Sequence, residues 1–530
     1  MIAKMIKLKQ LLKDKKNDIF WLIFLAFSAL ILWLIGLGNL PLRDWDEGYY
    51  GTVAKDIFKS GNWLYLTYHN QPFLLKPPLV IWLINISYKI GGISELTTRF
   101  PGSFLTACGV PLLYLIGRNI FTYRISAILS SLVYLTLLPI VRHGRLAMLD
   151  GAINTFFLFS ILCLLESRRQ PFWAIGVGIG LGLIAFTKGI LAIALGGIIV
   201  FFILLNKPLF FLRNINLWIG LIVGFIPVFA WYYIQILQYG QEFIEVHFKQ
   251  QNFDRLSTAV EGNNGAIWYY FIELIKYSFP WLLFLPGGLK LAYQNYQQIW
   301  AKLILVCLII FMLIISMMGT KLPWYILPIY PFFSLAVGSY LATLWNTNNK
   351  PYPKLIGISL LIGSLVVLVG GIYLTLTEKN WQFLILGIIL GITLFLSAWN
   401  IFKKDFRFIP ILVVGLYMGL GFFVLSKFWI WELNESFPVK PVATLIRENT
   451  PPGTVVYTSF AYSRTSLDFY SDRQVIAESR ETLENVASNP SYLLLDTETW
   501  QKLKSSNPSI YEGKILGKAE EFILLETFAN

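Results

Sequence analysis

The chain is poor in the residues that build covalent cross-links and metal centres. It contains three cysteines and three histidines in 530 residues. Cys108, Cys163 and Cys307 all fall within apolar runs, where cysteine usually acts as a small buried hydrophobic residue. We therefore expect neither a disulfide framework nor a cysteine-ligated metal. Low-complexity tracts and obvious internal repeats are also missing from the sequence.

Charged residues are scarce as well, at 14%, whereas hydrophobic residues make up 56%. Repeated apolar runs of about 20 residues predict a polytopic α-helical membrane protein. The first run, residues 19–40, is too long for a signal-peptide core and has no evident cleavage site, so it is expected to stay as an anchor. The net charge of +13 comes mainly from short loops, which favours membrane topology over a nucleic-acid partner.

The orientation depends on one short run, residues 79–90. A run of this length is more typical of an interfacial helix than of a spanning one. Residues 1–17 hold six lysines and one acid, which predicts a cytoplasmic N-terminus. If 79–90 does not cross, the predicted cytoplasmic segments carry 19 Lys and Arg and four acids, as the positive-inside rule requires. If it crosses, these bases lie outside.

The first model gives thirteen spans and places the first outer loop at residues 41–99. The expected spans cover residues 19–40, 100–117, 124–141, 151–167, 171–187, 190–206, 217–237, 266–289, 302–318, 324–345, 355–376, 382–400 and 409–428.

The same model places many polar side chains on the outer side. Each alone is typical of a solvated loop, but their gathering on one face of a membrane bundle favours a functional site. The set consists of Asp46, Glu47, Lys76, Arg142, His143, Arg145, Asp150, Lys188, His247, Arg255, Lys321 and Tyr325.

The first outer loop is the densest of these segments. Asp46 and Glu47 form a carboxylate pair in which one oxygen can take a proton from an attacking acceptor. Lys76 precedes two prolines, which fix the local backbone and thus the direction of its ammonium group toward a phosphate. The alternative is an ordered interfacial loop with Trp and Tyr at the membrane surface.

Two further segments carry candidate groups. Lys321 and Tyr325 lie one helical turn apart, so both side chains are able to reach one phosphate. Asp150, between the sequence RHGR and a predicted span, is placed to orient a sugar hydroxyl or a base.

The last hundred residues change in composition, so we expect two domains: a transmembrane domain at 1–430 and a soluble extracytoplasmic α/β domain at 431–530. Strands are predicted at 455–457, 474–476 and 492–495, helices at 466–470, 481–487 and 499–505, and a hairpin within 514–527. This region has no Gly-rich phosphate loop and no nucleophile motif, which favours a structural or acceptor-facing role.

Several motifs occur in the order found in lipid-linked glycosyltransferases. They are DWDEGYYGTVAKDIFKSGNW, LLKPPLVIWL, ISELTTRFPG, MLDG, FTKGILAI, HFKQQNFDR, IWYYF and KLPWYILPIYP. Over residues 18–345 the chain resembles the type C superfamily. Within it, the sequence is most similar to glycosyltransferase family 39, in the bacterial aminoarabinose-transferase-like branch related to protein O-mannosyltransferases.

The resemblance implies a type C fold with about 13 transmembrane helices in the inner or plasma membrane, and an outward-facing active site. The donor would be a sugar on a polyprenyl phosphate, and the acceptor a glycolipid, a protein or a cell-envelope glycan. Such enzymes invert the anomeric centre. The matching motifs imply a role for each candidate residue. Asp46 is expected to be the base, with Glu47 and Asp150 as further catalytic acids. The expected donor-phosphate ligands are Lys76, Lys321, Tyr325 and Arg255, and His247 is the histidine expected near a metal.

The sequence departs from the family pattern at two places. Leu75 stands where the family commonly has a glutamate before Lys-Pro-Pro, and that glutamate helps to hold a metal. We therefore predict no metal or other cofactor. The alternative is a divalent ion held by other residues. Gly48 and Tyr49 stand where the aminoarabinose branch has an arginine, which argues against a fixed choice of aminoarabinose as the sugar or lipid A as the acceptor.

Two other classes of function fit part of the pattern. A lipid or solute transporter also has many spans and intramembrane charges, but its charges are expected near the midplane, with broken helices in matching halves. A non-catalytic scaffold has no need to keep Asp46, Lys76, Asp150 and Tyr325 together.

Overall fold

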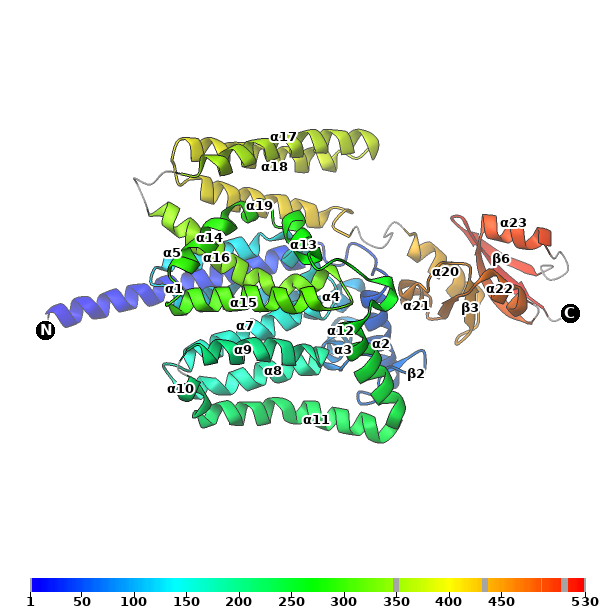
Figure 1. The fold of residues 1–530 in the computed structure, drawn as a ribbon. Helices are drawn as coiled ribbons and strands as arrows, with labels where there is room; N and C mark the ends of the chain where they lie inside the picture. Colours follow the sequence, from blue (N-terminus) through cyan, green and yellow to red (C-terminus); the bar gives the residue numbers. More distant parts are fainter. Residues whose placement is uncertain are drawn as a thin grey trace. The chain divides into compact units, whose positions relative to one another are not determined.

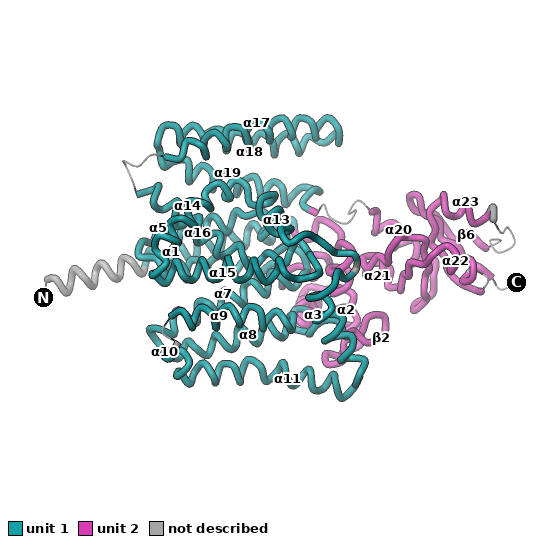
Figure 2. The backbone as a smooth tube through the Cα atoms, viewed as in Figure 1, with its two compact units in different colours: residues 1–36, 74–80, 102–429 teal, residues 37–73, 81–101, 430–530 magenta. Residues whose placement is uncertain are grey.

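The computed structural model describes residues 2–206, 208–346, 352–430, 437–487, 489–506 and 513–528. Lys207 and Lys350, two of the lysines counted in predicted cytoplasmic loops, lie outside the described residues. The chain is mostly helical, with one small sheet near the C-terminus (Figure 1). Its contacts divide it into two compact units (Figure 2): a helical unit of residues 1–36, 74–80 and 102–429, and a mixed unit of residues 37–73, 81–101 and 430–530.

Nine helical segments in the described part of the chain are long and apolar enough to span a membrane. They are Lys16–Leu34 within α1 (Ile2–Leu34), α4 (Glu95–Ile120), η1 (Pro171–Trp173) with α8 (Ala174–Lys188), α11 (Ile215–Phe243) with η2 (Ile244–Phe253) and α12 (Asp254–Ser257), α15 (Ile299–Met317), η5 (Pro323–Ile329) with α16 (Tyr330–Trp345), α17 (Lys354–Thr377), α18 (Gln382–Phe402) and α19 (Phe408–Leu425).

The other predicted spans are shorter or broken, so the count of thirteen is not confirmed. A tenth span arises only if α5 (Arg124–Leu135) and α6 (Leu138–Gly144), bent by 57°, are taken together. The remaining segments are α7 (Asp150–Glu166), α9 (Leu191–Leu204), and a run that breaks into α13 (Tyr269–Tyr277), η4 (Trp281–Phe284) and α14 (Leu285–Gln294). Prolines at 139, 280 and 286 lie at these breaks, because proline removes a backbone donor and ends regular helix. The run at 79–90 forms α3 (Leu79–Gly91), which is also short.

Close helix packing in the helical unit depends on small residues. A Cβ at Gly178 would lie 2.1 Å from the carbonyl carbon of Gly220, and one at Gly182 would lie 2.1 Å from the carbonyl oxygen of Gly224. Helices α8 and α11 therefore approach backbone to backbone, as apolar helices do in a membrane where shape, not hydrophobicity, drives their association.

Three of the twelve outward polar residues serve the fold of this unit. The buried Arg145 guanidinium donates to the carbonyl oxygens of Leu32 (2.7 Å), Trp33 (3.0 Å) and Ile35 (2.7 Å). These carbonyls lie at the C-terminal end of α1, which has no further helical turn to satisfy them. Arg142 donates to the carbonyl of Trp429 at 2.9 Å, and His143 Nδ1 lies 3.1 Å from the Pro139 carbonyl.

The sheet of the mixed unit has the strand order β4-β3-β5-β7-β6. Strand β3 (Val455–Thr458) pairs in parallel with β4 (Gln474–Ala477) and β5 (Ser491–Asp496), while β7 (Phe522–Thr527) pairs antiparallel with β5 and β6 (Lys514–Ala519). These strands lie at their predicted positions, as do α21 (Thr465–Ser471), α22 (Arg480–Ala487) and α23 (Thr497–Ser506). Helix α20 (Val439–Asn449) was not predicted.

The first loop contributes α2 (Asp46–Ser60), β1 (Thr67–Tyr68) and β2 (Gln71–Pro72) to the same unit. Helices α2 and α21 pack so closely at Gly48 that an added Cβ would lie 2.5 Å from the carbonyl carbon of Thr465. No larger residue fits at position 48, which gives a physical reason for glycine there. The functional division of the chain at residue 430 stays a prediction.

Candidate functional site

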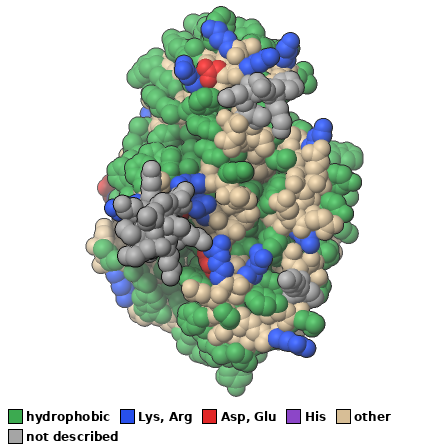
Figure 3. Space-filling view, turned by 90° about the vertical axis from the view of Figure 1, so that its left-hand side faces the viewer, with side chains coloured by type: hydrophobic (Ala, Val, Ile, Leu, Met, Phe, Trp, Pro, Cys, Tyr) green, Lys and Arg blue, Asp and Glu red, His purple; other side chains and the backbone are tan. Residues whose placement is uncertain are grey.

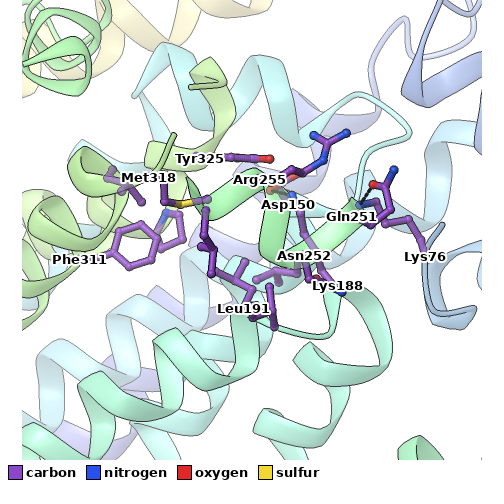
Figure 4. Close-up of a pocket in the computed structure, with 15 residues that line it drawn as sticks. Lys76, Asp150, Lys188, Leu191, Gln251, Asn252, Arg255, Phe311, Met318 and Tyr325 are labelled. Atoms are coloured by element: carbon purple, nitrogen blue, oxygen red, sulfur yellow. Dashed lines mark hydrogen bonds and ion pairs between the residues drawn. The ribbon is translucent and has the colours of Figure 1, made fainter. Parts of the chain in front are cut away.

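A cavity of about 70 Å³ within the helical unit brings together residues from distant parts of the chain (Figure 4). Its charged lining residues are Lys76, Lys188, Arg255 and Asp150, and Tyr325 adds an aromatic ring. Three cations against one carboxylate give the lining an excess of positive charge. An anionic group is therefore the ligand that this cavity favours.

Asp150 and Lys188 form the central ion pair of the cavity. Asp150 is the first residue of α7 and is buried, and its Oδ1 lies 2.8 Å from Nζ of Lys188, the last residue of α8. The Lys188 ammonium also lies 4.8 Å from the ring centroid of Tyr325, which η5 supplies. The pair thus joins three segments, and the aromatic face holds the ammonium by a cation–π contact.

Gly189 allows this arrangement directly after Lys188. Its φ of 21° ends α8, and an added Cβ would lie 2.8 Å from the Tyr232 hydroxyl. A larger residue at this position would push α8 and α11 apart beside the cavity.

Lys76 is oriented by Gln251. Lys76 Nζ donates to Oε1 of Gln251 at 2.9 Å (Figure 4), and Gln251 belongs to the π-helix η2. Segment η2 follows a break in α11 at Gly240, where φ is 56°. Such π-helical segments are rare and are frequent at functional sites. The amide fixes the lysine without cancelling its charge.

His247 acts on Lys76 through the backbone. The Leu74 carbonyl can only accept, so His247 Nδ1–H donates to it at 2.9 Å, and in the neutral ring Nε2 accepts from the Tyr232 hydroxyl at 3.0 Å. The ring is buried and stacks on Phe243 at 4.9 Å. Both ring nitrogens are therefore engaged, and His247 positions the chain two residues before Lys76. Among the described residues, no group of three or more His, Cys, Asp or Glu is arranged to hold a metal ion.

Lys321 has a different position from the one predicted for it. It is buried and does not line the cavity; its ammonium donates to the carbonyl oxygens of Ile315 (3.0 Å), Ser316 (2.6 Å) and Met318 (2.6 Å). An ammonium has three protons, and these three carbonyls at the C-terminal end of α15 take them. Burial lowers the pKa of Lys321. These contacts favour a role for Lys321 at the helix end, and its predicted role as a phosphate ligand is not tested.

Glu47 likewise serves the fold of its own unit. It is fully buried, and the Arg99 guanidinium donates two hydrogen bonds of 2.8 Å to its carboxylate. The Arg43 backbone N–H adds a third bond to Glu47 at 3.0 Å. Arg99 also donates to the carbonyls of Leu37, Leu40 and Pro41, so the pair fixes the start of the first loop. The catalytic role of Glu47 stays a prediction, and these contacts favour a structural role instead.

The residues around Asp46 are held firmly. Asp44 Oδ2 accepts from Arg464 at 2.7 Å, and Trp45 has a φ of 67°, a conformation that is strained for a bulky residue. The Thr465 hydroxyl donates to the Trp45 carbonyl at 3.0 Å, and the Trp45 ring stacks on Tyr462. Helix α21 and its flanking residues therefore determine how this loop lies.

Asp46 differs from the acids on either side of it. It begins α2 and is half-buried, and its side chain has no hydrogen-bond or ion-pair partner in the described part of the chain. Of the three neighbouring acids Asp44, Asp46 and Glu47, it is the one whose carboxylate is not bound by an arginine in the described part of the chain.

Comparisons with known proteins agree with this picture. Residues 75–234 match the family model described as dolichyl-phosphate-mannose-protein mannosyltransferase. An uncharacterized protein of Aquifex aeolicus (strain VF5) is 25% identical, covering 95% of this chain and 98% of that protein. An undecaprenyl phosphate-alpha-4-amino-4-deoxy-L-arabinose arabinosyl transferase of Yersinia pestis (strain Pestoides F) is 26% identical, covering 66% of this chain and 65% of that enzyme.

The fold points the same way. The crystal structure of ArnT from Cupriavidus metallidurans, solved with undecaprenyl phosphate bound, superposes with a TM-score of 0.79 at 16% identity, covering 96% of this chain and 98% of that one. The chain resembles ArnT-like type C glycosyltransferases in sequence and in fold. The resemblance expected from the motifs is thereby confirmed.

Sequence reasoning missed three polar lining residues of the cavity. The sequence predicts Lys188 on the outer side without a role, although it is the lysine of the motif FTKGILAI. Gln251 and Asn252 lie in the motif HFKQQNFDR, and their signal was a run of polar residues at the end of a long apolar helix. Asn252 Nδ2 donates to the His247 carbonyl at 2.6 Å, which helps to hold η2.

Proposed function

We propose that this protein transfers a sugar from a polyprenyl-phosphate donor to an acceptor on the outer face of the membrane. The observation that carries the proposal is the cavity in which Lys76, Lys188 and Arg255 outnumber the single carboxylate of Asp150. A polyprenyl phosphate joins an anionic phosphate to an apolar tail, which suits a cationic cavity between apolar helices, and the bound ligand named for the Cupriavidus ArnT has the same chemistry. The acceptor is a glycolipid, a protein or another cell-envelope glycan.

The cations act on the leaving phosphate. As the bond between the anomeric carbon and the phosphate oxygen breaks, the phosphate gains negative charge, so ammonium and guanidinium groups stabilise the transition state more than the bound donor. Lys76 and Arg255 contact the phosphate, and the Tyr325 hydroxyl donates to it. Asp150 keeps Lys188 charged and in place through the 2.8 Å ion pair.

Asp46 is the base. The acceptor hydroxyl or amine attacks the anomeric carbon on the face opposite the phosphate, and its proton passes to the Asp46 carboxylate. A single displacement of this kind inverts the anomeric centre. The assignment is supported by the half-buried, unoccupied carboxylate of Asp46 and by the engagement of Asp44 and Glu47 with Arg464 and Arg99.

The proposed orientation has a cytoplasmic N-terminus and an extracytoplasmic C-terminal domain, in the inner or plasma membrane. It is tested with single cysteines in a cysteine-free background and an impermeant thiol reagent. A cysteine at the exposed Ser60 should be labelled from outside, and one at Asn400, near the end of α18, should not. Labelling at Asn400 alone inverts the topology.

The function is tested by profiling lipid-linked glycans in a deletion strain. A polyprenyl-phosphate sugar should accumulate when the transferase is lost, and its mass names the sugar. Wild type should clear the accumulated donor, and Lys76→Ala should not. An unchanged lipid-linked pool in the deletion strain overturns the proposal, and a donor that accumulates only on the cytoplasmic face indicates a flippase instead.

A further inference from the structure

A second cavity lies in the helical unit and shares no lining residue with the first. Its volume is about 230 Å³, and Arg168 and Lys302 are its charged lining residues, next to Asn206 and the rings of Phe210 and Phe211. No acid occurs among its described lining residues. The two cations make it an anion site by charge.

The cavity forms where four elements end together. Arg168 follows α7, Asn206 follows α9, Phe210 and Phe211 belong to α10 (Pro208–Leu212), and Lys302 lies in the first turn of α15. Lys302 Nζ donates to the carbonyl of Leu205 at 3.1 Å, which links α15 to the end of α9. Figure 3 views the bundle from the end at which α10 lies in Figure 1, and Lys and Arg clearly exceed Asp and Glu on this face.

The charge of Arg168 is not offset locally. Its side chain has no hydrogen-bond or ion-pair partner within the described ranges. The nearest acid in sequence, Glu166, accepts from Asn119 at 2.7 Å and lies 3.9 Å from Arg169. Partial burial and the neighbouring charge of Arg169 lower the pKa of the Arg168 guanidinium. This direction is expected where no anion lies close enough to stabilise the charged form.

The surroundings of the cavity have the composition of a membrane–water interface. Exposed aromatic side chains occur at Phe172 and Trp173 in η1, at Phe210, and at Trp218 near the start of α11. Trp218 Nε1 donates to the carbonyl of Leu212, the last residue of α10, at 2.9 Å. Tryptophan prefers the headgroup level of a bilayer, so the cavity lies at that level.

An apolar surface continues from the cavity. Exposed side chains of α9 and α10 include Phe201, Leu204 and Leu209. A soluble anion makes no contact with this apolar surface. A phospholipid, in contrast, places its phosphate between cations at headgroup level and its acyl chains along apolar helices. We propose that Arg168 and Lys302 bind the phosphate of an anionic phospholipid headgroup, whose acyl chains lie along α9 and α10.

The test is native mass spectrometry of the full-length, delipidated protein titrated with phosphatidylglycerol or phosphatidylcholine. Wild type should retain one phosphatidylglycerol and no phosphatidylcholine at the same concentration. Arg168→Gln and Lys302→Gln should each weaken retention about fivefold, and the double variant about twenty-five-fold. Arg168→Lys keeps the charge and should restore most of the binding.

The matched control is the double variant Lys403→Gln/Lys404→Gln, which removes two exposed cations from the loop after α18. It should bind as wild type does. Equal loss in this control, or equal retention of phosphatidylcholine, overturns the proposal. Complete displacement of the lipid by an equal concentration of inorganic phosphate also overturns it and assigns the cavity to a free anion. The proposal is independent of the transferase activity.

Discussion

The acids of the first loop and the cations of the main cavity are held in opposite ways. In the loop, Glu47 and Asp44 each meet an arginine at 2.8 Å or less, so opposite charges cancel. In the cavity, Lys76 is held by the neutral amide of Gln251, and the described lining keeps an excess of positive charge. The cancelled charges of the loop fix its backbone, and we propose that the net positive charge of the cavity, beyond the pair of Lys188 with Asp150, serves to bind an anionic ligand.

The same contrast separates neighbouring residues of one type. Glu47 and Asp46 are adjacent, yet only Glu47 is tied to an arginine. Lys76 lines the cavity, whereas the three protons of Lys321 go to backbone carbonyls. The account therefore assigns chemistry to Asp46 and Lys76, and stability to Glu47 and Lys321.

The largest effect on activity is expected for Asp46→Asn. The amide keeps the size of the side chain but cannot take the acceptor proton, so single-turnover transfer should fall by about 10² to 10⁴. Donor affinity and thermal stability should stay near wild type, because the carboxylate has no partner in the described structure. Near-normal transfer would remove the base from this loop and make Asp150 the next candidate.

Glu47→Gln should act on stability. It leaves the fully buried Arg99 without its counter-charge, and breaking a buried ion pair from one side costs about 3–5 kcal/mol. Denaturant unfolding of the purified protein in detergent measures this loss. A variant that is as stable as wild type but inactive would instead give Glu47 a role in the chemistry.

Lys321→Met should have a smaller effect on stability. Methionine fills much of the same volume. Three carbonyls at the end of α15 lose their shared donor, but they are neutral, so the substitution leaves no buried charge without its counter-charge. The melting temperature should fall while the donor affinity of the folded fraction stays unchanged. A fall in donor affinity at constant melting temperature would return Lys321 to the phosphate site.

Much of the fold could be predicted from the sequence because its signals are local. Apolar runs predicted the helices, short apolar segments predicted β3, β4 and β5, and the alternation of strands with helices predicted an α/β layer. The early end of α9 and the break between α13 and α14 could not be predicted, since hydropathy averages over the prolines and turns that end a helix. The predicted count of thirteen spans is therefore not confirmed by the nine helices that are long and apolar enough to cross within the described residues.

The site shows the same limit. Asp150, Lys76, Arg255 and Tyr325 were predicted and do line one cavity. The roles of Glu47 and Lys321 depend on partners distant in sequence or on backbone carbonyls, which a motif does not reveal. The ion pair of Lys188 with Asp150 joins the ends of α7 and α8 and becomes visible only in three dimensions.

The most direct test of the account is the affinity for the polyprenyl-phosphate sugar, measured without acceptor in nanodiscs. Lys76→Ala should weaken binding roughly ten- to a hundredfold, because it removes a charge-assisted bond to the phosphate. Lys76→Arg should restore binding only in part, since it keeps the charge but changes the reach. The control is Lys249→Gln in η2, an exposed lysine paired with Glu245, which should bind as wild type does. Unchanged donor affinity in Lys76→Ala, or an equal loss in Lys249→Gln, would contradict the assignment of the cavity to the donor phosphate.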